Sequence, residues 1–352
     1  METALKSFCF DGKPISSEKY GEGHINQTYL VVTDAGKRYI MQRLNHVVFK
    51  DPNGLMGNVD AVTSFLAKKY DDPRRSLHLI PTVNGDKWFI DPEGEYWRVY
   101  DFVEDSVCLQ MARSPEDFKN SASAFGEFQS ALIDFPADTL CETIPNFHNT
   151  PARYEQFKES LKRNASGRAD EVKEEIEFIL SREKDAAYLQ ERLENGILPL
   201  RVTHNDTKLN NVLFDEATGN ALCIIDLDTV MPGLVAYDFG DSIRFGASTG
   251  AEDEKDLSKV EMDLELYKVY CDGFVPACPG LTAEEIRSLP YGAKIITLEN
   301  ALRFLMDYID GDVYYKTSRP EHNLDRARTQ CKLVSDMESK FEEMKSICEA
   351  YI

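Results

Sequence analysis

The sequence predicts an α+β fold in two parts, a strand-rich N-terminal part and a larger helical C-terminal part. Short hydrophobic runs separated by turn sequences occupy the first ~100 residues, as is typical of strands. After Glu104, long segments with hydrophobic residues at helical spacing dominate. The chain has 352 residues, of which 42% are hydrophobic, so it is long enough for two parts that each bury a core. We divide it into residues 1–103 and 104–352.

The N-terminal part is expected to contain five strands and one helix. The turn at residues 33–36 separates two strand-like runs and favours a hairpin. A helix follows, because Leu55, Val59, Val62 and Leu66 share one helical face. The strands are expected at residues 26–32, 37–43, 77–83, 87–90 and 96–103.

The C-terminal part is expected to be mostly helical. Ser114 and Thr282 each precede acidic residues, which is the pattern of a helix N-terminus, because a hydroxyl caps the first free N–H groups. Two strand-like runs, residues 211–214 and 221–225, interrupt the helices. The helices are expected at residues 115–133, 151–162, 170–194, 252–270, 283–310 and 325–351.

The chain is acidic, with 40 Lys plus Arg against 61 Asp plus Glu, a formal net charge of −21. This charge argues against nucleic acids and anionic membranes as partners, because both attract basic surfaces. A nucleotide stays compatible with it, because a bulk charge leaves room for a local basic pocket. No apolar run reaches the length of a membrane span.

The eight cysteines are scattered, with no C-x-x-C pair and no Cys/His cluster at zinc spacing. The N-terminal residues do not have the pattern of a signal peptide. We therefore expect a cytoplasmic protein with reduced thiols, and oxidising export is the alternative. A monomer is expected.

The residues with the clearest chemistry lie in the segment 203–228. Asp206 and Asn211 stand five residues apart in one loop, and a strand pair then returns Asp226 beside Asn211. Phosphoryl transfer needs a carboxylate near the acceptor hydroxyl and hard oxygen ligands that hold Mg²⁺ against the phosphates. Alone, each short motif is more often a turn, a cap or a strand end, but their combination predicts phosphoryl transfer.

This pattern, H-x-D-x-x-x-x-N, then a hairpin, then Ile-Ile-Asp, resembles the catalytic loop of the aminoglycoside phosphotransferase and choline kinase superfamily, relatives of the protein kinases. The resemblance implies a bilobal, protein-kinase-like fold with a nucleotide-binding N-lobe and a catalytic, sugar-binding C-lobe. It implies that Asp206 is the catalytic base, that Asn211 and Asp226 bind the metal, and that the reaction uses Mg²⁺ and ATP. Asp238 resembles the structural Asp that braces the catalytic loop.

Further segments, spread from about Gly21 to Lys332, closely resemble the N-acetylhexosamine 1-kinases. They are residues 21–26, 201–211, 238–247, 303–305, 311–314 and 320–324. The resemblance implies transfer to the anomeric (C1) hydroxyl of N-acetylglucosamine or N-acetylgalactosamine, which gives the sugar 1-phosphate. A small-molecule sugar and ATP are then the partners.

The same resemblance implies sugar contacts from Asp206, His24, Phe245, Arg303 and Tyr314. An aromatic face packs on a sugar ring, and an arginine donates to hydroxyl or N-acetyl oxygens. For His24 a surface turn is the alternative. For the last three, the alternatives are a core Phe, a surface Arg in a salt bridge and a buried Tyr.

On the nucleotide side, Gly21 and Gly23 stand where a phosphate-covering loop precedes the second strand, although a hairpin turn explains them equally well. The hinge resembles that of kinases, in which backbone groups bind adenine, and this implies contacts at Asp101 and Val103. An edge strand that runs into a loop is the alternative.

One departure concerns the lysine with which protein kinases grip the α- and β-phosphates from the third strand. Strand alternation places Gln42 there, and a neutral amide supplies no charge. Lys208 either contacts the γ-phosphate or is a solvated loop lysine. Asp228, two residues after Asp226, is either a second metal group or an orienter.

Two rival functions remain. One is another kinase of this fold that acts on choline, an aminoglycoside, an amino alcohol or another sugar; Arg303 suits a cationic acceptor poorly. The other is a non-catalytic nucleotide-binding pseudokinase, which the missing lysine favours and the presence of Asp206, Asn211 and Asp226 opposes. The sequence does not distinguish gluco from galacto acceptors or identify the group that replaces the lysine.

Overall fold

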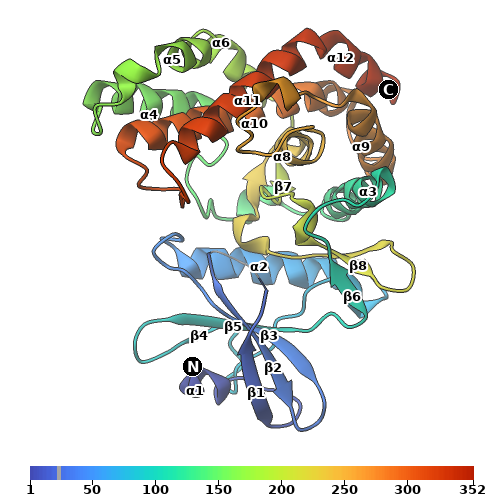
Figure 1. Cartoon of the computed structure of the whole chain (residues 1–352). Helices are drawn as coiled ribbons and strands as arrows, with labels where there is room; N and C mark the ends of the chain where they lie inside the picture. Colours follow the sequence, from blue (N-terminus) through green and yellow to red (C-terminus); the bar gives the residue numbers. More distant parts are fainter. Residues whose placement is uncertain (22–24) are drawn as a thin grey trace. The chain divides into compact units, whose positions relative to one another are not determined.

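The computed structural model describes residues 1–21 and 25–352 (Figure 1). Its chain divides into two compact units. Unit 1 comprises Met1–Leu109, Ala131–Pro145 and Asn211–Pro232, and unit 2 comprises Gln110–Ser130, Asn146–Asn210 and Gly233–Ile352. Unit 1 therefore includes two segments from beyond residue 103, where we divide the sequence.

Unit 1 contains an antiparallel five-stranded sheet in the order β1-β2-β3-β5-β4. Side chains alternate across the sheet, so that Val31, Met41 and Val99 are fully buried in one cluster. The short helix α1 (Glu2–Leu5) adds Ala4 to that cluster. The strands are β1 (Pro14–Lys19), β2 (Gln27–Thr33), β3 (Arg38–Arg43), β4 (Phe89–Ile90) and β5 (Tyr96–Asp101).

The predicted helix of unit 1 is α2 (Pro52–Leu66). Its N-terminus is capped by Asp51, whose side chain accepts a hydrogen bond from Gly54 N at 2.9 Å, and Pro52 opens the first turn. The four hydrophobic residues predicted to share a face are all buried. A 3₁₀ turn, η1 (Pro73–Arg75), follows.

A second sheet of unit 1 has the order β6-β8-β9. Its strands are β6 (Ser106–Cys108), β8 (Val212–Asp215) and β9 (Ala221–Ile224), so the predicted hairpin of the later strands is present. Two further 3₁₀ turns belong to this unit, η2 (Ala137–Thr139) and η5 (Leu227–Thr229).

Unit 2 is helical and is organised around α10 (Ala283–Asp310), which is buried along most of its length. A capping box between Thr282 and Glu285 starts α10 where predicted, and Gly311 ends it at φ 101°. α8, α11 and α4 pack against α10 (Figure 1). The other helices of the unit are α3 (Pro115–Ala131), α4 (Thr150–Arg163), α5 (Lys173–Leu180), α6 (Glu183–Ala186), α7 (Tyr188–Glu194), α8 (Val235–Gly246), α9 (Leu264–Ala277), α11 (His322–Ser339) and α12 (Phe341–Glu349).

Short elements connect these helices: η3 (Ala169–Glu171), β7 (Arg201–Thr203), η4 (Leu209–Asn211), β10 (Met231–Gly233) and η6 (Leu257–Lys259). Together, the strands of unit 1 and the helices of unit 2 confirm the predicted α+β class. Within the described part of the chain, none of the helices combines the length and apolarity that a membrane span requires.

Several predicted element boundaries were wrong. The single helix expected at 170–194 is broken into η3, α5, α6 and α7. At the break after α5, the Ser181 hydroxyl and the Arg182 guanidinium both donate to the Phe178 carbonyl, and Arg182 also pairs with Glu338 of α11 at 2.8 Å. Side-chain bonds to a helix-end carbonyl and a tertiary ion pair thus replace continued helix. Similarly, residues 325–351 form two helices, α11 and α12.

Two other predicted elements, the strand at 77–83 and the first part of the helix at 252–270, are absent from the structure. Residues 77–83 form isolated bridges at Leu79 and Thr82 rather than a strand, and Pro81 lacks the N–H that a continuous ladder needs. In the predicted helix 252–270, only the portion from Leu264 is helical. The strand β1 and the helix α8 are present although neither is among the predicted elements.

Candidate active site

The loop that holds Asp206 lies between β7 and η4 and is attached to the first turns of α8. The backbone N–H groups of His204 and Asn205 donate to the Asp238 carboxylate at 2.9 and 2.8 Å. The Thr207 hydroxyl donates to the Asp238 carbonyl at 2.6 Å. Asn205 has φ +64°, a conformation that disfavours most side chains, so these bonds hold a turn of elevated energy. The predicted bracing role of Asp238 is confirmed by these contacts.

The Asp238 carboxylate is itself buried and accepts a third hydrogen bond, from Gln129 Nε2 at 2.7 Å. Burial raises the pKa of Asp238, and the donated hydrogen bonds oppose that rise. His204 is enclosed by Phe125 and Phe128, with ring centroids at 5.6 and 6.0 Å. Its Nδ1 accepts the N–H of Asp206 at 3.3 Å, so the histidine supports the residue that we predict to be the base.

Lys208 pairs with Asp206. Its Nζ lies 2.7 Å from Asp206 Oδ1, and both side chains are partly exposed. Although burial alone would lower the pKa of Lys208, the carboxylates of Asp206 and Asp241 raise it, so the lysine stays charged. Lys208 is therefore a partly exposed loop lysine whose charge is paired with a carboxylate of the same loop, and its contact with a γ-phosphate stays a prediction.

The two predicted metal ligands lie in unit 1 at the open end of the β8–β9 hairpin, Asn211 just before β8 and Asp226 just after β9. Ile225 N donates to the Asn211 carbonyl at 2.9 Å, and Asp226 follows directly. Asp226 is exposed and has a left-handed backbone conformation (φ 60°, ψ 58°). An amide and a carboxylate are oxygen donors of the kind that Mg²⁺ accepts, and Mg²⁺ usually completes its shell with water and substrate phosphates. The donor chemistry at this hairpin end therefore fits Mg²⁺.

Asp228 is oriented differently from Asp226. It is 3% exposed, and its two carboxylate oxygens face donors: Arg98 Nη1 lies 2.5 Å from Oδ1, and Asn26 Nδ2 donates to Oδ2 at 2.5 Å. Of the two roles predicted for Asp228, these contacts favour a residue that orients its neighbours over a second metal ligand. Arg98 had no place in our sequence interpretation. A charged residue inside the hydrophobic run Tyr96–Tyr100 was the signal that could have identified it.

The nucleotide-side residues are only partly described. Gly21 has φ +73°, which glycine adopts without strain, whereas Gly23 and His24 lie outside the described residues. Asp101, the last residue of β5, donates its N–H to the His78 carbonyl at 3.1 Å. Val103 is buried, and its carbonyl accepts the Ser106 hydroxyl at 2.6 Å.

On the acceptor side, Arg303 of α10 lies between aromatic rings in unit 2. Its guanidinium carbon is 5.4 Å from the centroid of Phe147 and 5.7 Å from that of Tyr315. Although burial alone would lower the pKa of Arg303, the Tyr315 hydroxyl and the Glu299 carboxylate raise it, with a smaller contribution from Tyr314. Arg303 and Tyr314 are therefore neighbours, in an aromatic rather than an ion-paired setting.

Phe245 and Tyr314 are exposed, at 41% and 66% of their surface. The alternatives of a core Phe and a buried Tyr are therefore wrong. Phe245 is the penultimate residue of α8, and Arg244, next to it, pairs with Asp241 at 3.0 Å and Glu252 at 2.8 Å.

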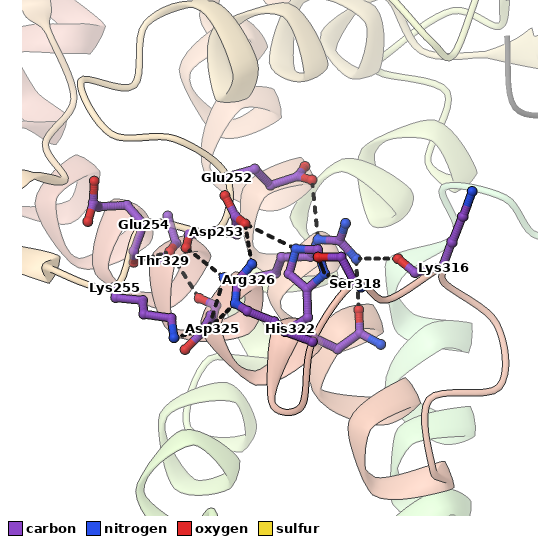
Figure 2. Close-up of polar contacts among 12 residues, drawn as sticks. Glu252, Asp253, Glu254, Lys255, Lys316, Ser318, His322, Asp325, Arg326 and Thr329 are labelled. Carbon is purple, nitrogen blue, oxygen red and sulfur yellow. Dashed lines mark hydrogen bonds and ion pairs between the residues drawn. The ribbon is translucent and has the colours of Figure 1, made fainter. Parts of the chain in front are cut away.

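The segment after α8, residues 252–255, is held by the start of α11 rather than by a helix of its own (Figure 2). Asp253 accepts from Arg319 Nη1 at 2.9 Å and lies 3.1 Å from His322 Nε2. Thr329 Oγ1 donates to the Glu254 carbonyl at 3.0 Å. Because these tertiary bonds occupy the segment, the helix predicted from residue 252 begins only at α9. Residues 320–324, one of the segments that resemble the N-acetylhexosamine 1-kinases, lie at the start of α11 and include His322, which contacts Asp253.

Comparisons with known proteins agree with this arrangement. The family described as phosphotransferase enzyme family (APH) matches residues 17–261. An aminoglycoside phosphotransferase structure from Alicyclobacillus acidocaldarius is 13% identical, with 99% of this chain and 96% of that chain covered and a TM-score of 0.61. A choline kinase from Cryptosporidium parvum is 15% identical, with 94% and 91% covered and a TM-score of 0.58.

An amicoumacin kinase in complex with AMP-PNP and Ca²⁺ is 11% identical, with 96% and 92% of the two chains covered and a TM-score of 0.61. At these identities the structural likeness concerns the fold, which is kinase-like with a sheet-containing N-lobe and a helical C-lobe. The family match, in contrast, spans most of the sequence, including Asp206, Asn211 and Asp226. The chain belongs to the phosphotransferase enzyme family.

Proposed function

We propose that this protein transfers the γ-phosphoryl group of ATP to the anomeric hydroxyl of an N-acetylhexosamine. The observation that supports it most directly is the braced loop: Asp238 holds His204 and Asn205, and the loop presents Asp206. The chain then reaches Asn211 and, through the hairpin, Asp226. Membership of the phosphotransferase family supports the reaction class.

In this proposal Asp206 orients the acceptor hydroxyl and takes its proton. An anomeric hydroxyl is more acidic than an ordinary alcohol, so a carboxylate is an adequate base for it. The Nζ of Lys208 lies 2.7 Å from Asp206 Oδ1 and places a positive charge beside the carboxylate. Asn211 and Asp226 would hold Mg²⁺, which, when bound, supplies positive charge to the phosphates.

Arg303, Tyr314 and Phe245 are the proposed sugar contacts in unit 2. Exposed aromatic rings can pack on the C–H face of a pyranose, and a charged guanidinium can donate to hydroxyl or N-acetyl oxygens. A choline or amino-alcohol acceptor is the runner-up, because similar folds include a choline kinase and an aminopropanol kinase. A cationic acceptor would meet repulsion at Arg303, which favours the sugar.

The test is an acceptor panel with ATP and Mg²⁺: N-acetylglucosamine, N-acetylgalactosamine, glucose, choline, ethanolamine and kanamycin. NMR of the product identifies the phosphorylated atom. We expect both N-acetylhexosamines to react fastest, with phosphate on C1. Phosphate on C6, or faster turnover of choline or kanamycin, contradicts the proposal.

Arg303→Met tests the acceptor contact. The expected result is a KM for the sugar raised by about tenfold or more, as for the loss of one charged hydrogen bond, with little change in the KM for ATP. Arg287→Met is the matched control, because Arg287 lies on the same helix and pairs on the surface with Glu284 and Glu349.

A further inference from the structure

Position 42 of β3 (Arg38–Arg43) holds a neutral glutamine where protein kinases have the lysine, but the neighbouring strand places a positive charge beside it. Gln42 faces Arg98 of β5 in the sheet register. Arg98 Nε donates to Gln42 Oε1 at 2.9 Å, and Gln42 Nε2 donates to Thr28 Oγ1 at 3.1 Å. The arginine is 1% exposed. A guanidinium is rarely buried without a specific partner, so its other contacts identify its role.

The main partner of Arg98 is Asp228, in the turn that follows Asp226. Arg98 Nη1 lies 2.5 Å from Asp228 Oδ1, and the second carboxylate oxygen accepts from Asn26 Nδ2 at 2.5 Å. Asn26 in turn accepts the N–H of Asn45 through its Oδ1 at 3.0 Å. One buried carboxylate therefore connects β5, the residue just before β2, and the turn that holds Asp226.

This connection constrains a turn whose backbone conformation is unfavourable in free energy. Asp226 is in the left-handed region, which a non-glycine residue keeps only where its surroundings fix it. Asp228 anchors the turn two residues later, and Asn58 Nδ2 of α2 binds the Val230 carbonyl at 2.9 Å. The turn is thus held at two points on one side of Asp226.

The electrostatics favour a permanent pair. Although burial alone would lower the pKa of Arg98, the carboxylate of Asp228 and the hydroxyl of Tyr100 raise it, and Asp226 contributes further. Because both oxygens of Asp228 already face donors, the carboxylate is not arranged as a metal ligand. Removing either partner would leave the other as a buried charge without its opposite charge, held only by neutral side chains such as Gln42 or Asn26.

We propose that Arg98 and Asp228 are the positioning pair of the metal–nucleotide site: the buried guanidinium holds Asp228, and Asp228 holds the turn that presents Asp226. The pair fixes the Asp226 turn against β5, and Asn26, which directly precedes β2, holds the second oxygen of Asp228. The inference rests on the proposed function in one respect, that Asp226 binds the metal of a nucleotide complex.

The test measures binding of Mn²⁺ to the ADP-loaded full chain by electron paramagnetic resonance, without any acceptor. Arg98→Gln, Asp228→Asn and the double variant are compared with the native chain. Each single variant is expected to weaken Mn²⁺ binding about 10- to 100-fold, as for partners that orient a ligand without contacting the metal. The double variant is expected to be no weaker than the worse single variant, because both act through one pair.

Arg98→Lys tests for partial rescue. Lysine keeps the positive charge but cannot contact both Gln42 and Asp228 as the guanidinium does. We expect its Mn²⁺ affinity to lie between those of the native chain and Arg98→Gln. Arg74→Gln is the matched control, because Arg74 pairs with Asp215 at 3.1 Å in the same unit, and should bind Mn²⁺ as the native chain does. If Arg98→Gln does not fold, as judged by its thermal transition, Arg98→Lys and Asp228→Glu replace the two single variants.

Two outcomes overturn the inference: native Mn²⁺ affinity in the variants, or a double variant whose loss is the product of the two single losses, which would make Asp228 an independent ligand. Failure of the proposed function is distinguishable. A chain that binds Mn²⁺–ADP through the pair but phosphorylates no sugar contradicts only the acceptor assignment. A chain that phosphorylates N-acetylglucosamine with variants of native Mn²⁺ affinity contradicts only the pair.

Discussion

At the scale of residues, Asp206 depends on carboxylates that do not react. Asp238 accepts the two N–H groups that precede Asp206 in the loop, and Asp241 accepts Thr207 N at 3.1 Å just after it. Although burial alone would raise the pKa of Asp241, Arg244 and Lys208 hold it below its usual value. Two ionic groups on successive turns of α8 thus fix the loop from both sides of Asp206.

Asp206→Asn tests the proposed base. The amide keeps the size of the side chain but cannot take a proton, so kcat is expected to fall about 10²- to 10⁴-fold. Affinity for AMP-PNP, measured by calorimetry, should stay near the native value. Glu216→Gln, which neutralises an exposed turn carboxylate, is the control. Native turnover in Asp206→Asn would exclude the base assignment.

At the scale of elements, α8 and α10 approach each other through glycines. A Cβ on Gly292 of α10 would lie 2.0 Å from the Ala236 carbonyl oxygen, and one on Gly240 of α8 would lie 2.4 Å from the Gly292 carbonyl oxygen. The backbones therefore touch where the two helices cross. This contact holds α8, and with it Asp238, against the central helix of unit 2.

Gly292→Ala is expected to destabilise the protein. Alanine favours a helix by about 1 kcal/mol over glycine, but the overlap with a backbone carbonyl costs about 1–3 kcal/mol or more. The free energy of unfolding in urea measures the difference. Gly57→Ala in α2 is the control: it is exposed, its Cβ would meet nothing within 4 Å, and we expect a gain of about 0.5–1 kcal/mol. A stabilised Gly292→Ala would contradict the close crossing.

The start of α11 is a second element whose role depends on side chains. His322 Nδ1 accepts Ser318 N at 3.1 Å, and its Nε2 lies 3.1 Å from Asp253 Oδ2. Burial lowers the pKa of His322 below its usual value, Arg326 and Arg319 lower it further, and Asp253 opposes them. The neutral imidazole is therefore the form that holds the segment after α8.

This shift predicts a pH dependence. The unfolded chain, with an ordinary histidine pKa of about 6.5, binds the proton more readily than the folded chain does. The stability that neutral His322 contributes is present above pH ~6.5 and is lost as pH falls through the lower folded pKa. Urea unfolding of native and His322→Asn chains from pH 5 to 8 should show a difference in stability that grows with pH. His46→Asn, which removes an exposed imidazole, is the control, and a pH-independent difference would contradict the prediction.

At the scale of the whole molecule, the residues proposed to act in the reaction belong to two different units of the chain. Asn211, Asp226 and the Arg98–Asp228 pair belong to unit 1, whereas Asp206, Arg303 and Tyr314 belong to unit 2. The unit boundary falls between Asn210 and Asn211, inside the catalytic motif itself. The net charge of −21 adds a second feature: in the proposed function, a bound divalent cation would supply the positive charge that the acidic chain lacks and that a nucleotide needs.

We therefore expect AMP-PNP to stabilise the whole chain only together with Mg²⁺. A ligand that binds only the folded state raises the free energy of unfolding by about 2.7 kcal/mol when its concentration is about 100 times Kd. The thermal midpoint should rise with AMP-PNP and Mg²⁺, and EDTA or Asp226→Asn should remove the rise. An equal rise in EDTA would exclude metal-dependent binding at this site.

Much of this protein is determined by local sequence. Hydrophobic alternation and periodicity predict β2, β3, β5, α2, α3 and α10, because one face of each must be buried. The H-x-D-x-x-x-x-N motif and the hairpin after it identify the phosphotransferase loop, because those residues are close in sequence. The brace Asp238 also followed from its motif.

The tertiary structure decided the rest, wherever partners are distant in sequence. Arg98 and Asp228 are 130 positions apart in the sequence. No sequence motif links an arginine in a strand with an aspartate in a turn at such a distance. Long-range bonds from α11 kept residues 252–255 out of a helix, and a crossing with α10 fixed α8 through two glycines. Local propensity is a weak preference that buried ion pairs and close backbone contacts outweigh, so the buried arginine beside Gln42 was visible only once β5 lay beside β3.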